Sequence, residues 1–211
     1  MAGSGNPGFM NPVNGVRDIA AITFLVQQML AGVATATLVK VQKVTNTGAA
    51  APVGFVDLLP LVNLIDGAGV TMPHATIFQC PYFRLQGGAN AVILDPQPGD
   101  LGIAVFADRD ISSASRAKGP ASPGSARRFS MADALYIGGV LNGTPSQFVR
   151  FSASGIEISS PTGITLDAPT VTMNTTGGVA ITSASLTHNG VNIGATHVHN
   201  DPQGGVVSPP H

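Results

Sequence analysis

Two histidines near the end of the sequence, His197 and His199, are separated by a single residue. On an extended backbone, residues i and i+2 project to the same side, so both imidazoles can face one atom. Two imidazoles from one chain are too few to close a metal site, but three chains around a threefold axis would supply six. Six nitrogen ligands complete an octahedral shell, and a closed shell indicates a structural metal instead of a catalytic one.

The donor set also limits which metal would bind. Imidazole binds iron, zinc, copper and nickel, and octahedral nitrogen coordination favours iron or nickel over zinc. The donor set alone therefore leaves iron and nickel open and makes zinc less favoured. Taken alone, a His-x-His pair also fits two surface histidines in a tail. The metal interpretation depends on the repeat that precedes the pair.

The other reactive residues do not form a catalytic motif in the sequence. His74 falls in an expected barrel loop, His188 in an expected turn of the repeat region, and His211 is terminal. Serine, aspartate and histidine occur without the Gly-x-Ser-x-Gly elbow of a hydrolase, and no phosphate-binding glycine loop or zinc-finger spacing is present. Cys80, within an apolar run, is expected to be a small buried side chain. We expect no enzyme.

The stretch 148–193 repeats a short apolar–polar–apolar triplet. Two apolar side chains of a triplet share one face of a strand, and turn-prone residues separate the triplets. The apolar pairs are Ile156/Ile158, Ile164/Leu166, Val171/Met173, Val179/Ile181 and Val191/Ile193. A repeat this short cannot bury its apolar face alone and must stack on copies of itself, within the chain or between chains. This predicts an oligomeric β-helix or β-prism needle.

The preceding part of the chain predicts a helix and a small barrel. Apolar residues at helical spacing indicate one amphipathic helix between residues 16 and 32. They are Ile19, Ile22, Val26, Met29 and Leu30. Five or six short alternating runs between residues 34 and 107, separated by turn residues, fit a Greek-key barrel of the OB type.

A Ser-, Gly- and Pro-rich stretch, 111–127, is expected to be a linker or long loop, followed by one helical turn at 130–134. The basic residues Arg116, Lys118, Arg127 and Arg128 cluster in this region, and we interpret them as a solvated loop.

Composition excludes some partners. Net charge is −1 and only 10% of residues are charged, so the Lys/Arg-rich face that nucleic acid requires is missing, and we expect no nucleic-acid partner. No basic segment followed by an apolar segment marks a signal peptide, which predicts synthesis in the cytoplasm. The longest apolar stretch, 19–39, is interrupted by polar residues and is not expected to span a membrane.

The order of helix, OB-like barrel, triplet repeat and terminal His-x-His resembles the central baseplate spike of contractile phage tails and related bacteriocins. The run RRFSMADALY at 127–136, followed by Gly138-Gly139, is similar to a junction in one branch of these spikes. The resemblance covers residues 16–199, and the run 195–199 is its most specific part. The tail 200–211 departs from the pattern.

The resemblance implies a homotrimer whose N-terminal and OB-like regions dock on the tail hub of the baseplate. Its intertwined β-helix would end in a tip where His197 and His199 of each chain hold one iron ion. The spike, located at the tip of the virion tail baseplate, would pierce the outer membrane of a Gram-negative host when the sheath contracts.

The expected fold class is therefore all-β with one N-terminal helix: an OB-fold-like barrel followed by an intertwined trimeric β-helix needle with a metal-capped tip. The expected segments are 1–15 (flexible tail), 16–32 (helix), 33–110 (OB-like barrel), 111–147 (linker and junction), 148–193 (trimeric β-helix) and 194–211 (tip and Pro/Gly-rich tail).

Two alternative functions use the same elements. A trimeric receptor-binding fibre or adhesin would share the shaft but should carry a globular, aromatic-bearing head, whereas small polar residues follow the repeats here. A single-strand-binding OB protein should interleave stacking aromatics with Lys and Arg. Phe78, Tyr82 and Phe83 are accompanied only by Arg84, so we expect these aromatics in the barrel core.

Overall fold

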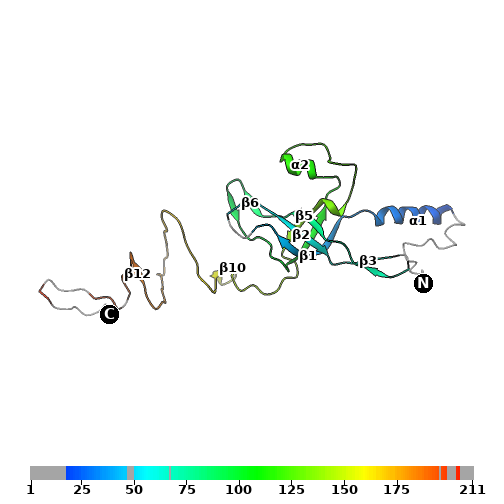
Figure 1. Ribbon diagram of the computed structural model, residues 1–211. Helices are drawn as coiled ribbons and strands as arrows, with labels where there is room; N and C mark the ends of the chain where they lie inside the picture. Colours follow the sequence, from blue (N-terminus) through cyan, green and yellow to red (C-terminus); the bar gives the residue numbers. More distant parts are fainter. Residues whose placement is uncertain (1–17, 47–49, 67, 195, 199–202, 205–211) are drawn as a thin grey trace. The chain divides into compact units, whose positions relative to one another are not determined.

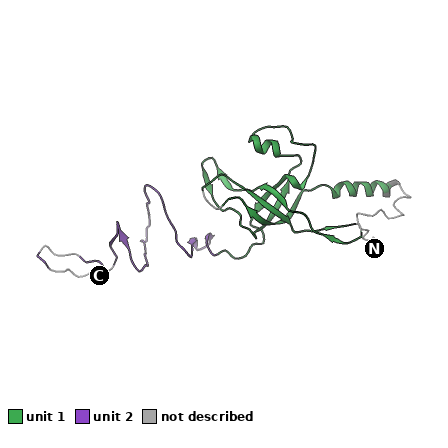
Figure 2. Ribbon diagram, viewed as in Figure 1, with its two compact units in different colours: residues 1–145 green, residues 146–211 purple. Residues whose placement is uncertain are grey.

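The computed structural model describes residues 18–46, 50–66, 68–194, 196–198 and 203–204 (Figure 1). The chain divides into two compact units, residues 1–145 and residues 146–211 (Figure 2). Most of the regular structure is β, and the described residues contain one helix of more than two turns. The predicted all-β class with a single N-terminal helix is therefore confirmed.

Unit 1 is built on a curled five-stranded antiparallel sheet. Its strands are β1 (Ala36–Val44), β2 (Phe55–Pro60), β5 (Ile77–Pro81), β8 (Leu101–Phe106) and β9 (Ala134–Gly138), in the order β5-β2-β1-β8-β9. The two edge strands approach each other, because Tyr82, directly after β5, forms a parallel bridge with Tyr136 of β9. The backbone N–H of Phe83 donates to the Tyr136 carbonyl at 2.9 Å. This contact curls the sheet around its core.

Side-chain alternation along the strands builds that core. In β1, Val39 and Val41 are buried while Lys40 between them is exposed, as the two-residue period of a strand requires. The buried apolar cluster consists of Val39, Val41, Val56, Leu58, Ile77, Cys80, Tyr82, Ala104, Phe106, Ala134 and Tyr136. The prediction that Cys80 is a small buried side chain is confirmed. Burial raises the pKa of its thiol to about 11, so little thiolate forms at neutral pH.

Strand β5 contains an irregularity that the sequence pattern does not reveal. Gln79 has a φ of 58°, and its backbone N–H donates to Asp57 Oδ1 at 3.0 Å. The pairing register with β2 shifts at this point. The bulge turns Ile77 and Cys80, three residues apart, toward the same core, whereas simple alternation would place them on opposite faces.

The three neighbouring aromatic residues, Phe78, Tyr82 and Phe83, differ in how far their side chains are exposed. Tyr82 is 5% exposed, but Phe78 is 67% exposed and Phe83 is 65% exposed. The prediction that these aromatics fill the barrel core is therefore confirmed for Tyr82 and wrong for Phe78 and Phe83. The bulge explains Phe78, because it leaves that side chain on the outer face of the sheet.

The Tyr136 ring packs against two glycines that face each other across β8 and β9. Gly102 pairs with Gly138, and a Cβ built on Gly102 would lie 2.5 Å from Tyr136 Cε2 and 2.6 Å from the backbone oxygen of Ile137. Real Cβ atoms do not approach backbone this closely. Position 102 therefore requires glycine, because any side chain there would collide with the packed Tyr136 ring.

The remaining elements of unit 1 are short. They are α1 (Asp18–Ala31), α2 (Ser112–Ala117), the 3-10 turn η2 (Met131–Asp133), and the two small hairpins β3 (Leu64–Ile65) with β4 (Thr71–Met72) and β6 (Leu85–Gly87) with β7 (Asn90–Val92). The helical turn predicted at 130–134 is confirmed by η2. Strand β9 extends the sheet beyond residue 110, and α2 lies within the stretch predicted as linker. No helix among the described residues is long and apolar enough to cross a membrane.

Unit 2 consists of two hairpins joined by extended chain. The first pairs β10 (Phe148–Ser152) with β11 (Gly155–Ser159), and the second pairs β12 (Thr187–His188) with β13 (Val191–Asn192). Residues 160–186, all of which are described, contain no helix or strand. A strand requires a hydrogen-bonded neighbour, and one chain supplies none to these triplets. The β-helix needle remains a prediction.

Candidate functional site

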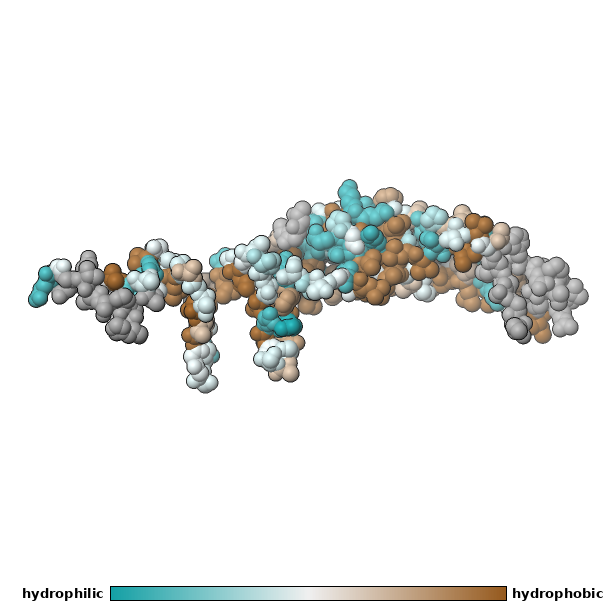
Figure 3. All heavy atoms as spheres, turned by 90° about the horizontal axis from the view of Figure 1, so that it is seen from below, coloured by the Kyte–Doolittle hydropathy of each residue, from teal (hydrophilic) through white to brown (hydrophobic). Residues whose placement is uncertain are grey.

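The apolar residues of the repeat lie on the surface of unit 2. All ten side chains of the five apolar pairs are exposed, from 46% for Ile193 to 72% for Leu166. Figure 3 shows hydrophobic side chains at the surface of the described part of unit 2. Scattered exposed apolar residues are normal in proteins, but a continuous series of them marks a surface that is covered in the functional state.

The hairpin of β10 and β11 shows how this surface is organised. Val149 pairs with Ile158 and Phe151 with Ile156, so four exposed apolar side chains share one face. The opposite face carries an ion pair between Arg150 and Glu157, which are also directly opposite each other.

A two-stranded hairpin is marginal in water unless its apolar face packs against another element. One face of this hairpin is therefore built for contact and the other for solvent. Arg150 is the last basic residue of the sequence, so every later repeat presents its apolar residues without a neighbouring positive charge.

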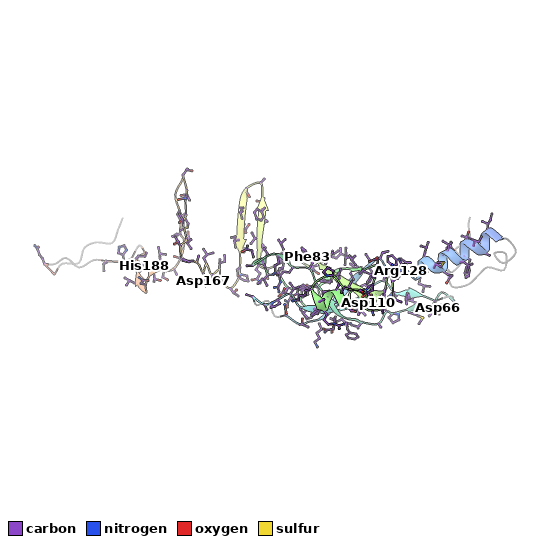
Figure 4. The ribbon with its side chains drawn as sticks, turned by 90° about the horizontal axis from the view of Figure 1, so that it is seen from above. Asp66, Phe83, Asp110, Arg128, Asp167 and His188 are labelled. Carbon is purple, nitrogen blue, oxygen red and sulfur yellow. The ribbon has the colours of Figure 1, made fainter. Side chains whose placement is uncertain are left out.

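The second hairpin begins the region that leads to the histidines. Asn189 and Gly190 have φ values of 51° and 79°, the two positive angles that a type I′ turn requires. The turn predicted around His188 is therefore confirmed. Figure 4 labels His188 on this hairpin and Asp167 on the extended chain that precedes it.

Hydrogen bonds to Gly194 position the His197 ring. The Gly194 carbonyl accepts from the backbone N–H of His197 at 3.1 Å and lies 2.6 Å from its Nδ1. A carbonyl oxygen only accepts, so Nδ1 carries the proton, and in the neutral ring Nε2 carries the lone pair. Metal-bound histidines commonly donate their other ring nitrogen to a backbone carbonyl in this way. His197 therefore has the tautomer that suits a metal ligand.

The second predicted ligand, His199, lies outside the described residues. Among the residues that the structure does describe, no group of three or more His, Cys, Asp or Glu side chains could hold a metal ion within one chain. Of the two predicted ligands, only His197 is among the described residues. The predicted metal site stays a prediction.

Unit 1 contains a buried ion pair that the sequence analysis did not identify. Arg84 donates to both carboxylate oxygens of Asp95, at 2.6 and 2.7 Å from Nη2, and its Nη1 donates to the Ala51 carbonyl at 2.6 Å. Both side chains are almost fully buried, and the hydrogen bond to Asp95 raises the pKa of Arg84. Every strong donor has an acceptor here, which indicates a structural role in fixing the segment after β5.

A second ionic cluster corrects the interpretation of the basic loop. Arg127 forms ion pairs with Asp133 at 2.7 Å and with Asp110 at 2.9 Å, and both carboxylates are buried. Arg127 is therefore not part of a solvated loop: it ties the Ser/Gly/Pro-rich segment to the sheet. The signal in the sequence was the pair of aspartates that flank this segment, Asp110 before it and Asp133 after it.

This cluster predicts a loss of stability in acid. Hydrogen bonds from Ser112 and from the Ser125 hydroxyl, together with Arg127, lower the pKa of Asp110 from its usual 3.8 to about 2. When the pKa of a carboxyl group is lower in the folded than in the unfolded protein, its ionised form stabilises the fold. This stabilisation is fully present at pH values above the pKa of the unfolded state, and it is lost as the pH falls through the pKa of the folded state. We expect Asp110→Asn to be less stable than the wild type at pH 7, and the difference to shrink between pH 3.8 and about 2.

The measurement is urea unfolding at a series of pH values. Asp108→Asn is the matched control, because the Asp108 side chain is mostly exposed and only two residues away. A difference between Asp110→Asn and the wild type that stays constant over this pH range would contradict the assignment.

No protein-family model and no curated protein sequence matches the chain.

Proposed function

We propose that the protein is the trimeric central spike of a contractile tail baseplate. It would dock on the tail hub through its N-terminal and OB-like regions and pierce the host outer membrane during sheath contraction. The observation that carries the proposal is the series of exposed apolar pairs in residues 156–193, on a segment with no Lys or Arg. Such a segment has no stable state alone and becomes a rigid shaft when three copies cover one another's apolar faces.

The barrel also supports the proposal. The curled antiparallel sheet β5-β2-β1-β8-β9, with a parallel contact between its edge strands, supports the interpretation of unit 1 as a five-stranded partly open OB barrel. Such a barrel folds around its own core and can act as a base for the shaft. The proposed work is mechanical: piercing requires stiffness, and we assign no catalytic step to any residue.

A metal at the tip would hold the three chain ends together. His197, protonated at Nδ1, would coordinate the metal through Nε2, and His199 would be its companion. Three such pairs would form the six-imidazole shell that favours iron, with zinc or nickel less favoured. Chain ends are where fraying begins, and a closed metal site there opposes it.

The test is the mass of the purified protein by light scattering, with elemental analysis of the same sample. We expect three times the 21.3 kDa of one chain and one iron ion per trimer. The double variant His197→Ala/His199→Ala should lose the metal and remain trimeric, because the apolar repeats are unchanged. His188→Ala, in strand β12 of the second hairpin, is the matched control and should keep the metal.

Two other outcomes would change the proposal. A metal-free trimer would remove the tip site and favour the receptor-binding fibre or adhesin, which shares the shaft but needs no metal. A monomer at micromolar concentration would contradict the shaft itself.

A further inference from the structure

Helix α1 carries an apolar surface that the described residues of unit 1 do not bury. Ile19, Ile22, Val26 and Met29 are all exposed, and residues 19–31 contain no charged side chain. A helix of 14 residues is marginal in water by itself and normally depends on packing of its apolar face. This surface therefore needs a partner.

The spacing of these residues indicates what the partner is. Steps of three, four and three residues place Ile19 and Val26 at the a positions of a heptad and Ile22 and Met29 at the d positions. This is the seam of a coiled coil, and isoleucine at d disfavours a two-stranded coil and shifts the preference to three or more strands. Leu25 and Leu30 fall at g and e, are exposed as well, and widen the seam.

The side of α1 away from the seam carries small or polar residues, except for Phe24 at position f. Gln27 and Gln28 occupy positions b and c, away from the seam. Apart from Asp18 at the first g position, positions e and g carry no charges that would select a different partner chain or set an antiparallel orientation. The helix thus has the features of one strand in a parallel bundle of identical chains.

We propose that three copies of α1 pack as a parallel three-helix bundle through Ile19, Ile22, Val26 and Met29. This inference rests on the trimer of the proposed function. About two heptads are too short to associate strongly alone, but trimeric repeats hold the chains together and greatly raise the local concentration of α1. The bundle would give the trimer a second clamp, at the opposite end of the sequence from the tip.

Cross-linking of single cysteines tests the bundle in the full-length protein. Ile22→Cys places a thiol in the seam, and Gln27→Cys places one on the outer side of the same helix. The natural Cys80 is buried with a raised pKa, so it should not react in the folded protein. With a short bis-maleimide we expect Ile22→Cys to give cross-linked chain pairs on a denaturing gel and Gln27→Cys to stay uncross-linked.

A second pair of variants tests the same surface without cross-linking. Val26→Asp places a charge in the seam, and Gln27→Asp places the same residue outside it. We expect the helical circular dichroism signal to fall in Val26→Asp and to be kept in Gln27→Asp.

The mass by light scattering separates this inference from the proposed function. A trimer in which Ile22→Cys does not cross-link, or cross-links no better than Gln27→Cys, overturns the bundle and leaves the spike proposal standing. It would indicate that α1 binds a helix of another protein. A monomer overturns both.

Discussion

Replacing Ile164 with Asp is expected to convert the proposed trimer into monomers. Ile164 belongs to a triplet whose apolar side chains are exposed in one chain and would be buried between three. The change would place three carboxylates close together in an apolar interior, and the cost of burying each charge is several kcal/mol. Light scattering should show the mass fall to the 21.3 kDa of one chain.

Thr165→Asp is the matched control for this experiment. Thr165 lies between Ile164 and Leu166, so in an extended triplet it points to the opposite face, which would be the solvent face of the shaft. The trimer should survive this change. If both variants remain trimeric, the apolar face of the repeat is not the contact between chains; if both become monomers, the effect is one of charge and not of position.

The second large effect is expected in the core of unit 1. Leu58 of β2 is fully buried at the centre of the sheet. Leu58→Ala should lower the free energy of unfolding by about 2–5 kcal/mol, because the lost side chain leaves a cavity that the surrounding strands fill only in part. Phe78→Ala, on the exposed face of the neighbouring strand, should change it by less than about 0.5 kcal/mol.

The chain itself provides a probe for this measurement. It contains no tryptophan and two tyrosines, Tyr82 and Tyr136, both buried in the sheet. Tyrosine fluorescence during urea unfolding therefore reports on unit 1 and is insensitive to residues 146–211. A loss of stability in Phe78→Ala as large as that in Leu58→Ala would mean that Phe78 is covered in the assembled protein.

The strands of unit 1 could be predicted where alternation was regular. Val39 and Val41 follow the two-residue period, so β1 is visible in the sequence. The bulge at Gln79 is not visible in the sequence, because it depends on the hydrogen bond from the Gln79 N–H to Asp57, a residue of another strand. Local patterns contain no information about such long-range contacts, and the wrong placement of Phe78 follows from this.

The candidate site shows the same division. Its apolar pairs and its turn at Asn189-Gly190 were predicted, because both depend on residue type and spacing. The partner of Arg127 was missed, since its carboxylates come from Asp110 and Asp133 at the two ends of a long loop. Pairing between repeats could not be read from one chain, because the neighbour of each triplet would belong to another chain.

The exposed apolar pairs of unit 2 also have a consequence for biogenesis. A newly made chain that has not assembled exposes apolar, nearly uncharged segments, and such surfaces aggregate at cellular concentrations. Synthesis runs from the N-terminus, so the sheet of unit 1 can fold on its own core before the repeats leave the ribosome. In the proposed trimer, the order of the two units along the chain would shorten the interval between synthesis of the repeats and their burial against two other chains.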